Sequence, residues 1–463
     1  MGNWISSLLY KILMSRILFI GILGYIFLIM VIEDAQQYTK NYLIFFLYAF
    51  IGLIASWTVL YNSKGLLAEI FGVFNLIAFG IVPIFELLNN ITYWDGAEIR
   101  LPTMLLASFT ALSFQIFFLL GQKFRLNIFS YGKNQINHSL SPLAGLLLFF
   151  VQVCLFYILL DLYSWHFITL FFREGEHHFG LKIGDNPSFL MIEFFLRPLI
   201  FNIGISLFYF YKNPRFISIF GLCIGILAVF PTGVPRFLAV AMYLPFLLHA
   251  NYLFLSRLCT YSTVKNLFLP NILLLGIFLV FPVLDLFRGD GYKNAEIISI
   301  FGMRTIMAGH FDAFQMLARA LDVGEISFGG GLVGALLFFI PRSLWSTKPI
   351  GSGFYISELS NLSLDNVSMP LVAELYLNFW YFGIVFGGII LGVLVRSIDY
   401  LFQLNDRYRI TPSFAVYFQF IGLFIFLLRG PLMASFAYSV SIGLTWALII
   451  LFFLRFKVNK SAD

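Results

Sequence analysis

The chain has 463 residues, of which 60% are hydrophobic and 11% are charged, and its formal net charge is +6. Average soluble domains carry roughly 25% charged residues, so a water-soluble globular fold and an intrinsically disordered chain are both excluded. The mean hydropathy of +0.90 indicates the class that remains, that of multi-pass membrane proteins.

Apolar segments of spanning length recur along the whole chain. A helix that crosses a bilayer needs roughly 20 mainly apolar residues. The sequence predicts twelve such segments, with boundaries near 16–32, 42–60, 66–88, 103–121, 142–160, 189–211, 216–230, 236–255, 267–286, 371–395, 412–428 and 431–454. The first lacks a small-residue cleavage site, so we expect a retained helix rather than a signal peptide. The expected fold class is therefore an all-α polytopic membrane protein, with residues 1–463 forming a single integral membrane domain.

The distribution of charge predicts the orientation. If the N-terminus lies inside, the inner segments hold 16 of the 29 basic residues and four of the 23 acidic residues. The short loops then obey the positive-inside rule, which the opposite orientation violates at almost every loop. We expect both termini on the inner side. Because the basic excess lies in these alternating loops, no nucleic-acid partner is expected.

Two outer segments are longer than ordinary connections. They cover residues 161–188 and 287–370, and the second far exceeds the median connection of about 4–6 residues. The long segment contains two predicted helical runs, Phe301–Leu321 and Leu332–Ile340. We expect a partly helical outer loop with a function of its own.

Four outer arginines are exceptions to the positive-inside rule, and each lies beside glycine or proline at a span end. They are Arg236 in PTGVPR, Arg288 in FRGDG, Arg342 in FFIPRSLWSTKP and Arg429 in LLRGPL. Arg236 and Arg429 are predicted at helix N-termini, where free N–H groups favour anions. A guanidinium adds bidentate phosphate binding. The set indicates a pyrophosphate site, and the alternative is snorkelling to lipid phosphates.

Acid–base candidates lie in the same outer region. His310 falls on the apolar face of the predicted helix 301–321, and Asp312 falls on its opposite face, expected to be solvated and paired with a neighbouring arginine. Glu374 begins the tenth span, and Asp290 lies in FRGDG. His310, Glu374 and Asp290 are candidates to accept a proton. Purely structural roles, a core histidine, a dipole-stabilised acid and a turn former, remain open.

Metal and nucleotide sites have no sequence support. The three cysteines, Cys154, Cys223 and Cys259, show no ligand spacing, and neither do the adjacent His177 and His178. No phosphate-binding loop and no dinucleotide fingerprint is found. We expect no metal and no cofactor.

Several stretches of the second half resemble one family. They are PTGVPR at 231–236, GHFDAFQML at 309–317, GGGLVGALLFFIPRSLWSTKP at 329–349, AELYLNFWYFGIVFGGIILG at 373–392 and RGPL at 429–432. They resemble the Wzy-type polymerases of lipid-linked O-antigen or capsule repeat units. The likeness covers about 230–435, and the chain departs from the family pattern in its Thr-Gly-Val-Pro-Arg turn and in NFW.

The resemblance implies an all-helical GT-C-like glycosyltransferase of the bacterial inner membrane, with its active site facing the periplasm. It would transfer a growing glycan from undecaprenyl diphosphate to the non-reducing end of an incoming lipid-linked unit. The four arginines would bind the diphosphate. Trp345, Tyr376 and Asn378 would hold sugar, or else serve as interface aromatics and a helix-start residue. A chain-length regulator is a possible partner.

Two other functions stay open at this point. An O-antigen ligase, which transfers the glycan to lipid A core, has a similar architecture. A lipid-linked oligosaccharide flippase or other transporter would need polar residues along a pathway through the membrane. Glu86, Glu193 and Arg197 are the main polar residues inside the spans, and all three are expected toward the outer side.

Overall fold

The computed structural model describes most of the helical chain. The described residues are 42–59, 65–126, 136–163, 165–171, 177–178, 181–182, 195–211, 214–244, 271, 275–276, 309–404, 412–453 and 455–458. Arg288 and Asp290 lie outside these ranges, and so do most residues of the predicted spans 16–32 and 267–286. His310 is described in its backbone only.

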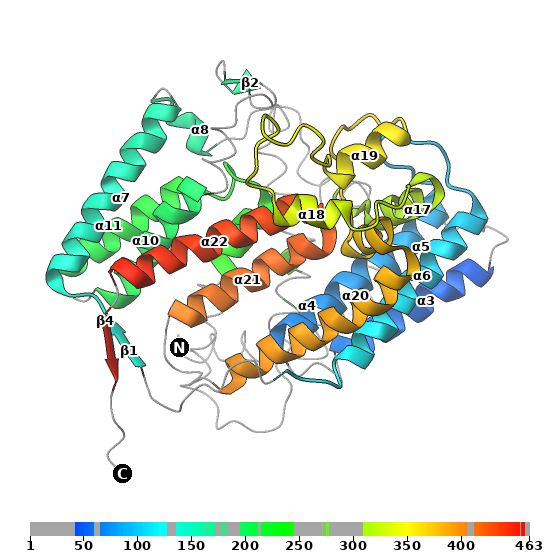
Figure 1. Cartoon of the computed structure of the whole chain (residues 1–463), viewed down its shortest axis with the longest axis horizontal. Helices are drawn as coiled ribbons and strands as arrows, with labels where there is room; N and C mark the ends of the chain where they lie inside the picture. Colours follow the sequence, from blue (N-terminus) through cyan, green and yellow to red (C-terminus); the bar gives the residue numbers. More distant parts are fainter. Residues whose placement is uncertain are drawn as a thin grey trace, which may run out of the picture.

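Helices make up nearly all of the described structure (Figure 1). They are α3 (Tyr42–Trp57), α4 (Leu66–Asn75), the π-helix η2 (Leu76–Ile81), α5 (Val82–Asn89), α6 (Leu101–Gly121), α7 (Pro142–Leu162), α8 (Ile168–Phe171), α10 (Arg197–Phe210), α11 (Arg215–Ala228), η6 (Gly309–Phe311), α17 (Ala313–Val323), α18 (Gly330–Leu336), α19 (Ser352–Leu359), α20 (Leu371–Leu404), α21 (Pro412–Arg429) and α22 (Leu432–Phe452). A further helix covers 236–244. The described structure also contains two short antiparallel β-ladders. β1 (Ile136–Ser139) pairs with β4 (Arg455–Val458), and β2 (His177–His178) pairs with β3 (Leu181–Lys182).

Five helical segments among the described residues are long and apolar enough to cross a membrane. They are Leu66–Asn89, Leu101–Gly121, Pro142–Leu162, Leu371–Leu401 and Leu432–Phe452. The shorter apolar helices are Leu47–Trp57, Arg197–Phe210, Arg215–Ala228 and Ala415–Arg429. The chain is thus a helical protein with several candidate membrane spans, and each of these segments lies within a few residues of a predicted one. The total of twelve stays a prediction.

Local sequence explains where α7 begins and why the segment Leu66–Asn89 is interrupted. Ser141 caps α7 by accepting a hydrogen bond from the Ala144 N–H at 3.2 Å, and Pro142 takes the first position, where its missing N–H costs nothing. The segment Leu66–Asn89 contains η2 just before Pro83, which cannot donate to the helix ladder. α20 is also interrupted, because Phe379 and Trp380 have non-helical backbone angles.

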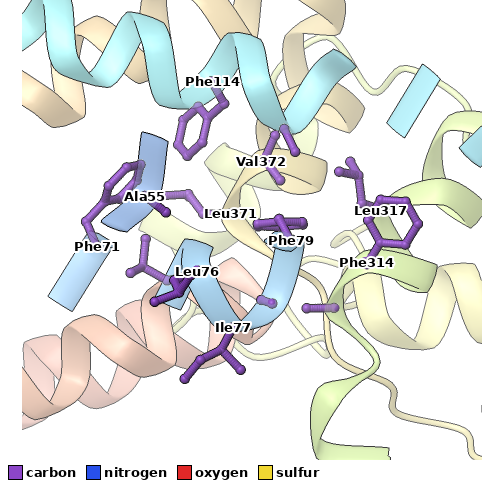
Figure 2. Packing of buried hydrophobic residues seen from close by; sticks show 14 of the residues in the cluster. Ala55, Phe71, Leu76, Ile77, Phe79, Phe114, Phe314, Leu317, Leu371 and Val372 are labelled. Carbon is purple, nitrogen blue, oxygen red and sulfur yellow. The ribbon is translucent and has the colours of Figure 1, made fainter. Parts of the chain in front are cut away.

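Two hydrophobic cores hold the helices together. One is built from α3 to α6, α17, α20 and α21, and the other from α7, α10, α11, helix 236–244, α21 and α22. In Figure 1, α3, α5, α6 and α20 lie on one side of α21, and α7, α10 and α11 lie on the other. Figure 2 shows part of the first core, where Phe71, Phe79 and Phe114 pack around Leu371 and Val372. α21 contributes to both cores and so joins the two halves.

Small residues allow α6 and α20 to approach closely. A Cβ added at Gly392 would clash with the Phe118 carbonyl oxygen and would lie 2.9 Å from the Cα of Gly121. Small residues at helix contacts are the usual means of tight packing in membranes, because lipid provides no hydrophobic drive for helix association.

We expect Gly392→Ala to lower the free energy of unfolding by about 1–3 kcal/mol, since the added methyl group has no space without moving backbone. Gly443→Ala in α22 is the matched control, because nothing lies within 4 Å of the added Cβ there. Equilibrium unfolding in mixed detergent–SDS micelles measures both. Equal effects from the two variants would mean that the α6–α20 contact does not limit stability.

Candidate functional site

Several polar side chains meet at one end of the helix bundle. The elements involved are the turn between α21 and α22, the first turn of α20, and the segment that joins η6 to α17. We call Trp94, Asp312, Ser368, Glu374 and Arg429 the Arg429 cluster. In Figure 1 the ends of these elements face α18 and α19, which cover this end of the bundle.

Asp312 is the centre of the Arg429 cluster. Its side chain is fully buried, and it accepts hydrogen bonds from the Trp94 indole N–H at 2.9 Å and from the Ser368 hydroxyl. The Arg429 Nη2 lies 3.2 Å from its Oδ1. A buried carboxylate is stable only when it is paired and hydrogen-bonded, and these three donors meet that need. The prediction that Asp312 lies on a solvated face, paired with a neighbour on its own helix, is wrong.

Arg429 is held in place while part of it stays accessible. Its Nη2 also donates to the Gly309 carbonyl oxygen at 3.1 Å, beside His310. The side chain is 37% exposed, and its buried Nε has no hydrogen-bond partner among the described residues. A cation fixed through one nitrogen, with other donors unused, is pre-organised to bind a planar or tetrahedral anion.

Arg429 does not lie at a helix N-terminus, as the sequence predicted. It is the last residue of α21, and Gly430 closes that helix with a hydrogen bond of 2.6 Å to the Phe426 carbonyl oxygen. α22 begins only at Leu432, because Pro431 takes the cap position. The guanidinium therefore sits at the negative end of the α21 dipole, which favours a cation there.

Glu374 links α20 to the start of α22. Its buried carboxylate accepts the Leu432 N–H at 2.7 Å and the Ser352 hydroxyl. The sequence correctly placed Glu374 in the first turn of its helix. The contact with α22 was not predicted from the sequence. It uses one of the free N–H groups at the start of α22, so one N–H fewer is available to an anion there.

Asn378 and Tyr376 lie one turn further along α20. The Asn378 Oδ1 accepts the Leu332 N–H at 2.8 Å, and its Nδ2 donates to the Glu374 carbonyl oxygen at 2.9 Å. Asn378 therefore holds the first turn of α18 close to the interruption in α20. The Tyr376 ring is buried and packs edge-on against Tyr381, with the ring centroids 5.5 Å apart.

A second polar group adjoins the cluster from α5. Buried Glu86 lies close to the side chains of Gln315 and Tyr93, and Gln315 donates to the Ile91 carbonyl oxygen at 2.7 Å. Burial, together with the negative charges of Glu86 and Asp312, raises the pKa of Tyr93 well above its usual range. The phenol therefore stays protonated and can act as a donor to Glu86.

Arg236 lies at the same end, at the start of helix 236–244, as its sequence predicted. Its side chain is buried, and the neighbouring Phe237 stacks on Phe426 with ring centroids 3.7 Å apart, three residues before Arg429. The preceding turn is held by Arg197, whose Nη1 donates to the Gly233 carbonyl oxygen at 2.9 Å. Arg197 thus stabilises the turn that precedes Arg236.

The loop that follows α18 is organised by its own cations. Arg342 donates to the carbonyl oxygens of Lys348 and Pro349 at 2.7 and 3.0 Å, and Lys348 donates to those of Phe338 and Ile340 at 2.6 and 2.9 Å. Burial, and then the charge of Arg342, lowers the pKa of Lys348. The loop is exposed and packs near the start of α22.

Trp345 belongs to the same loop, and its indole N–H donates to the Thr347 hydroxyl at 3.1 Å. Neither Trp345 nor Arg342 contacts the Arg429 cluster in the hydrogen bonds and ion pairs of the described residues. Within those residues, no group of three histidine, cysteine, aspartate or glutamate side chains is arranged to hold a metal ion.

Sequence reasoning missed part of the site. Trp94, Ser368 and Gln315 were not candidates, and Glu86 was weighed only as a residue inside a span. The chain from Tyr93 to Asp95 forms a tight turn, with φ of +60° at Trp94 and +51° at Asp95. A sequence such as YWDG indicates a turn but carries no sign of which distant carboxylate the tryptophan will meet.

Comparison with known proteins assigns no family. No protein-family model, no curated protein and no solved structure matches the chain.

We expect Asp312→Ala to lower the free energy of unfolding by about 3–5 kcal/mol, because it leaves a partly buried arginine and a buried indole N–H unpaired. Asp322→Ala is the control, since its ion pair with Arg100 is largely exposed and is worth less than about 1 kcal/mol. Both are measured by equilibrium unfolding in mixed micelles. A loss below about 1 kcal/mol for Asp312→Ala would contradict its central role.

Proposed function

We propose that the chain is a polymerase of undecaprenyl-diphosphate-linked oligosaccharide repeat units, of the O-antigen or capsule type. It would be a GT-C-like glycosyltransferase of the bacterial inner membrane, acting on the periplasmic face. The donor would be a growing glycan on undecaprenyl diphosphate, and the acceptor the non-reducing end of a second lipid-linked unit. No nucleotide sugar enters this reaction.

The observation that carries the proposal is the Arg429 cluster. A partly exposed arginine, fixed by a buried aspartate, lies at the bundle end within one turn of the Glu374 contact. Arg236 and Arg342 lie at the same end. A fixed cation suits a diphosphate leaving group, and a nearby carboxylate suits an acceptor hydroxyl. Both are needed for glycosyl transfer from a lipid diphosphate.

The reaction assigns a role to each kind of group. The acceptor hydroxyl oxygen attacks the anomeric carbon of the donor, and the bond from that carbon to the phosphate oxygen breaks. The hydroxyl proton passes to a base, for which Glu374, His310 and Asp290 are the candidates. The electron pair of the broken bond leaves on the lipid diphosphate, whose growing charge Arg429 stabilises, with Arg236, Arg288 and Arg342 as further candidates.

The resemblance of the motifs also supports the proposal. The RGPL motif supplies Arg429, GHFDAFQML supplies Asp312, and the stretch that begins AELYLNFWYFG supplies Glu374. These three motifs are far apart in sequence, yet their residues meet in space.

The test is an assay of the purified protein with synthetic undecaprenyl-diphosphate repeat units, EDTA and no nucleotide sugar, with products resolved on a gel. A ladder with repeat-unit spacing is the expected result. Product only after addition of lipid A core would identify a ligase instead. No product with either acceptor, together with movement of the lipid-linked unit across proteoliposomes, would identify a transporter.

We expect Arg429→Lys to slow ladder formation by about 100-fold, which is the usual loss when one donor to a developing negative charge is removed. Lysine keeps a positive charge near Asp312 but lacks the bidentate fork. Arg100→Lys is the matched control, since Arg100 is exposed and pairs only with Asp322 among the described residues. An unchanged rate for folded Arg429→Lys would remove Arg429 from the diphosphate site.

A further inference from the structure

A cavity lies at the opposite end of the bundle from the Arg429 cluster. It has a volume of about 700 Å³ and is formed where α3, α6 and α20 come together. Its lining includes Leu53, Trp57, Ile116, Leu120, Lys123 and Arg396, and we call it the basic cavity. α6 begins beside α17, where Arg100 pairs with Asp322, and ends just before Lys123 of the cavity, so at 1.5 Å per residue its 21 residues span about 30 Å between the two ends.

One wall of the basic cavity is apolar and open to the surroundings of the bundle. Leu53 is 67% exposed, Trp57 is 55% exposed, and Ile116 and Leu120 are exposed as well. All four belong to candidate spans or apolar helices, so their exposed faces meet lipid tails rather than water. An acyl chain can therefore lie along this wall without leaving the membrane.

The other end of the cavity is basic. Lys123 follows α6 directly, and Arg396 lies in the last part of α20. The Arg396 Nη1 is buried and has no hydrogen-bond partner among the described residues. The described lining contains no carboxylate. Two basic side chains without a carboxylate beside them, at the end of an apolar groove, are suited to binding an anionic headgroup.

The nearest carboxylate is already occupied. Asp399, one turn after Arg396, accepts the N–H groups of Leu67 and Ala68 at 3.2 and 3.3 Å and the Tyr417 hydroxyl at 2.5 Å. It thus caps the start of α4 and is 1% exposed. Its charge reaches Arg396 only through space, and no hydrogen bond joins the two in the described structure.

We propose that the basic cavity binds one anionic phospholipid, with the headgroup phosphate on Lys123 and Arg396 and an acyl chain along Leu53, Trp57, Ile116 and Leu120. Basic pockets between spanning helices are suited to anionic headgroups, because charge attraction and burial of apolar surface act together. The positive-inside rule places this end of the bundle at the inner leaflet. The site is independent of the proposed glycosyl transfer.

Native mass spectrometry of the detergent-purified full chain tests the proposal. The protein is titrated with phosphatidylglycerol, with phosphatidylcholine of the same acyl chains, and with inorganic phosphate. We expect one phosphatidylglycerol to be retained at concentrations where phosphatidylcholine is not. Equal retention of the two lipids would overturn the proposal, and saturable binding of inorganic phosphate alone would show an anion site without a lipid site.

The double variant Lys123→Gln with Arg396→Gln is expected to weaken retention of phosphatidylglycerol roughly 25-fold, since each basic side chain near an anionic surface contributes about fivefold. Arg125→Gln is the matched control. Arg125 lies at the same end, but its guanidinium covers the Tyr400 ring at 3.7 Å and does not line the cavity. An equal loss from Arg125→Gln would show a general charge effect and would overturn the site.

Leu120→Trp is a second variant that keeps all charges. Leu120 is 38% exposed, so a larger side chain can be accommodated while it fills the apolar groove. We expect retention of phosphatidylglycerol to fall at least tenfold, with the melting temperature unchanged. Unaltered retention would mean that the acyl chain does not lie on this wall, and the proposal would fail.

Discussion

The structure of the candidate site depends on the burial of one negative charge, that of Asp312. A carboxylate removed from water must find donors, and Asp312 finds them on three separate segments: Trp94 after α5, Ser368 before α20, and Arg429 at the end of α21. Removing the Asp312 carboxylate leaves these donors without their acceptor, which costs more than a hydrogen bond itself contributes. The same charge therefore holds these three segments together and fixes the arginine that we propose to act on the diphosphate.

The two ends of the bundle differ because α20 carries different chemistry along its length. Its first turns present Glu374 and Asn378, which are connected by hydrogen bonds to α22 and to the first turn of α18. Its later turns present small residues such as Gly392, which allow contact with α6, and then Arg396 beside the basic cavity. These two environments are those of the proposed diphosphate site and of the proposed lipid site.

Much of the fold was accessible from sequence, because the bilayer imposes a strong pattern. Apolar length alone located α6, α7 and α22 to within about two residues of the observed bounds. Position in the chain also placed Glu374 in a first helical turn and Arg236 at a helix start. The predictions that were wrong concern the partners of Asp312 and the helix end at which Arg429 lies. Helical periodicity correctly separated Asp312 from the apolar residues of α17, but it assigned that polar face to water, whereas the Tyr93–Trp94 turn and α21 cover it.

The sequence by itself determined the membrane class, several of the candidate spans and which chain segments are basic, since these follow from composition summed over some twenty residues at a time. Only the tertiary structure decided that Arg429 ends α21, that Asp312 is buried, and that Glu374 accepts the first N–H of α22. The contacts of Asp312 and Glu374 join residues that lie 58 to 218 positions apart in the chain. A local pattern carries no information on such a contact, because it records which groups need partners and not which ones they meet.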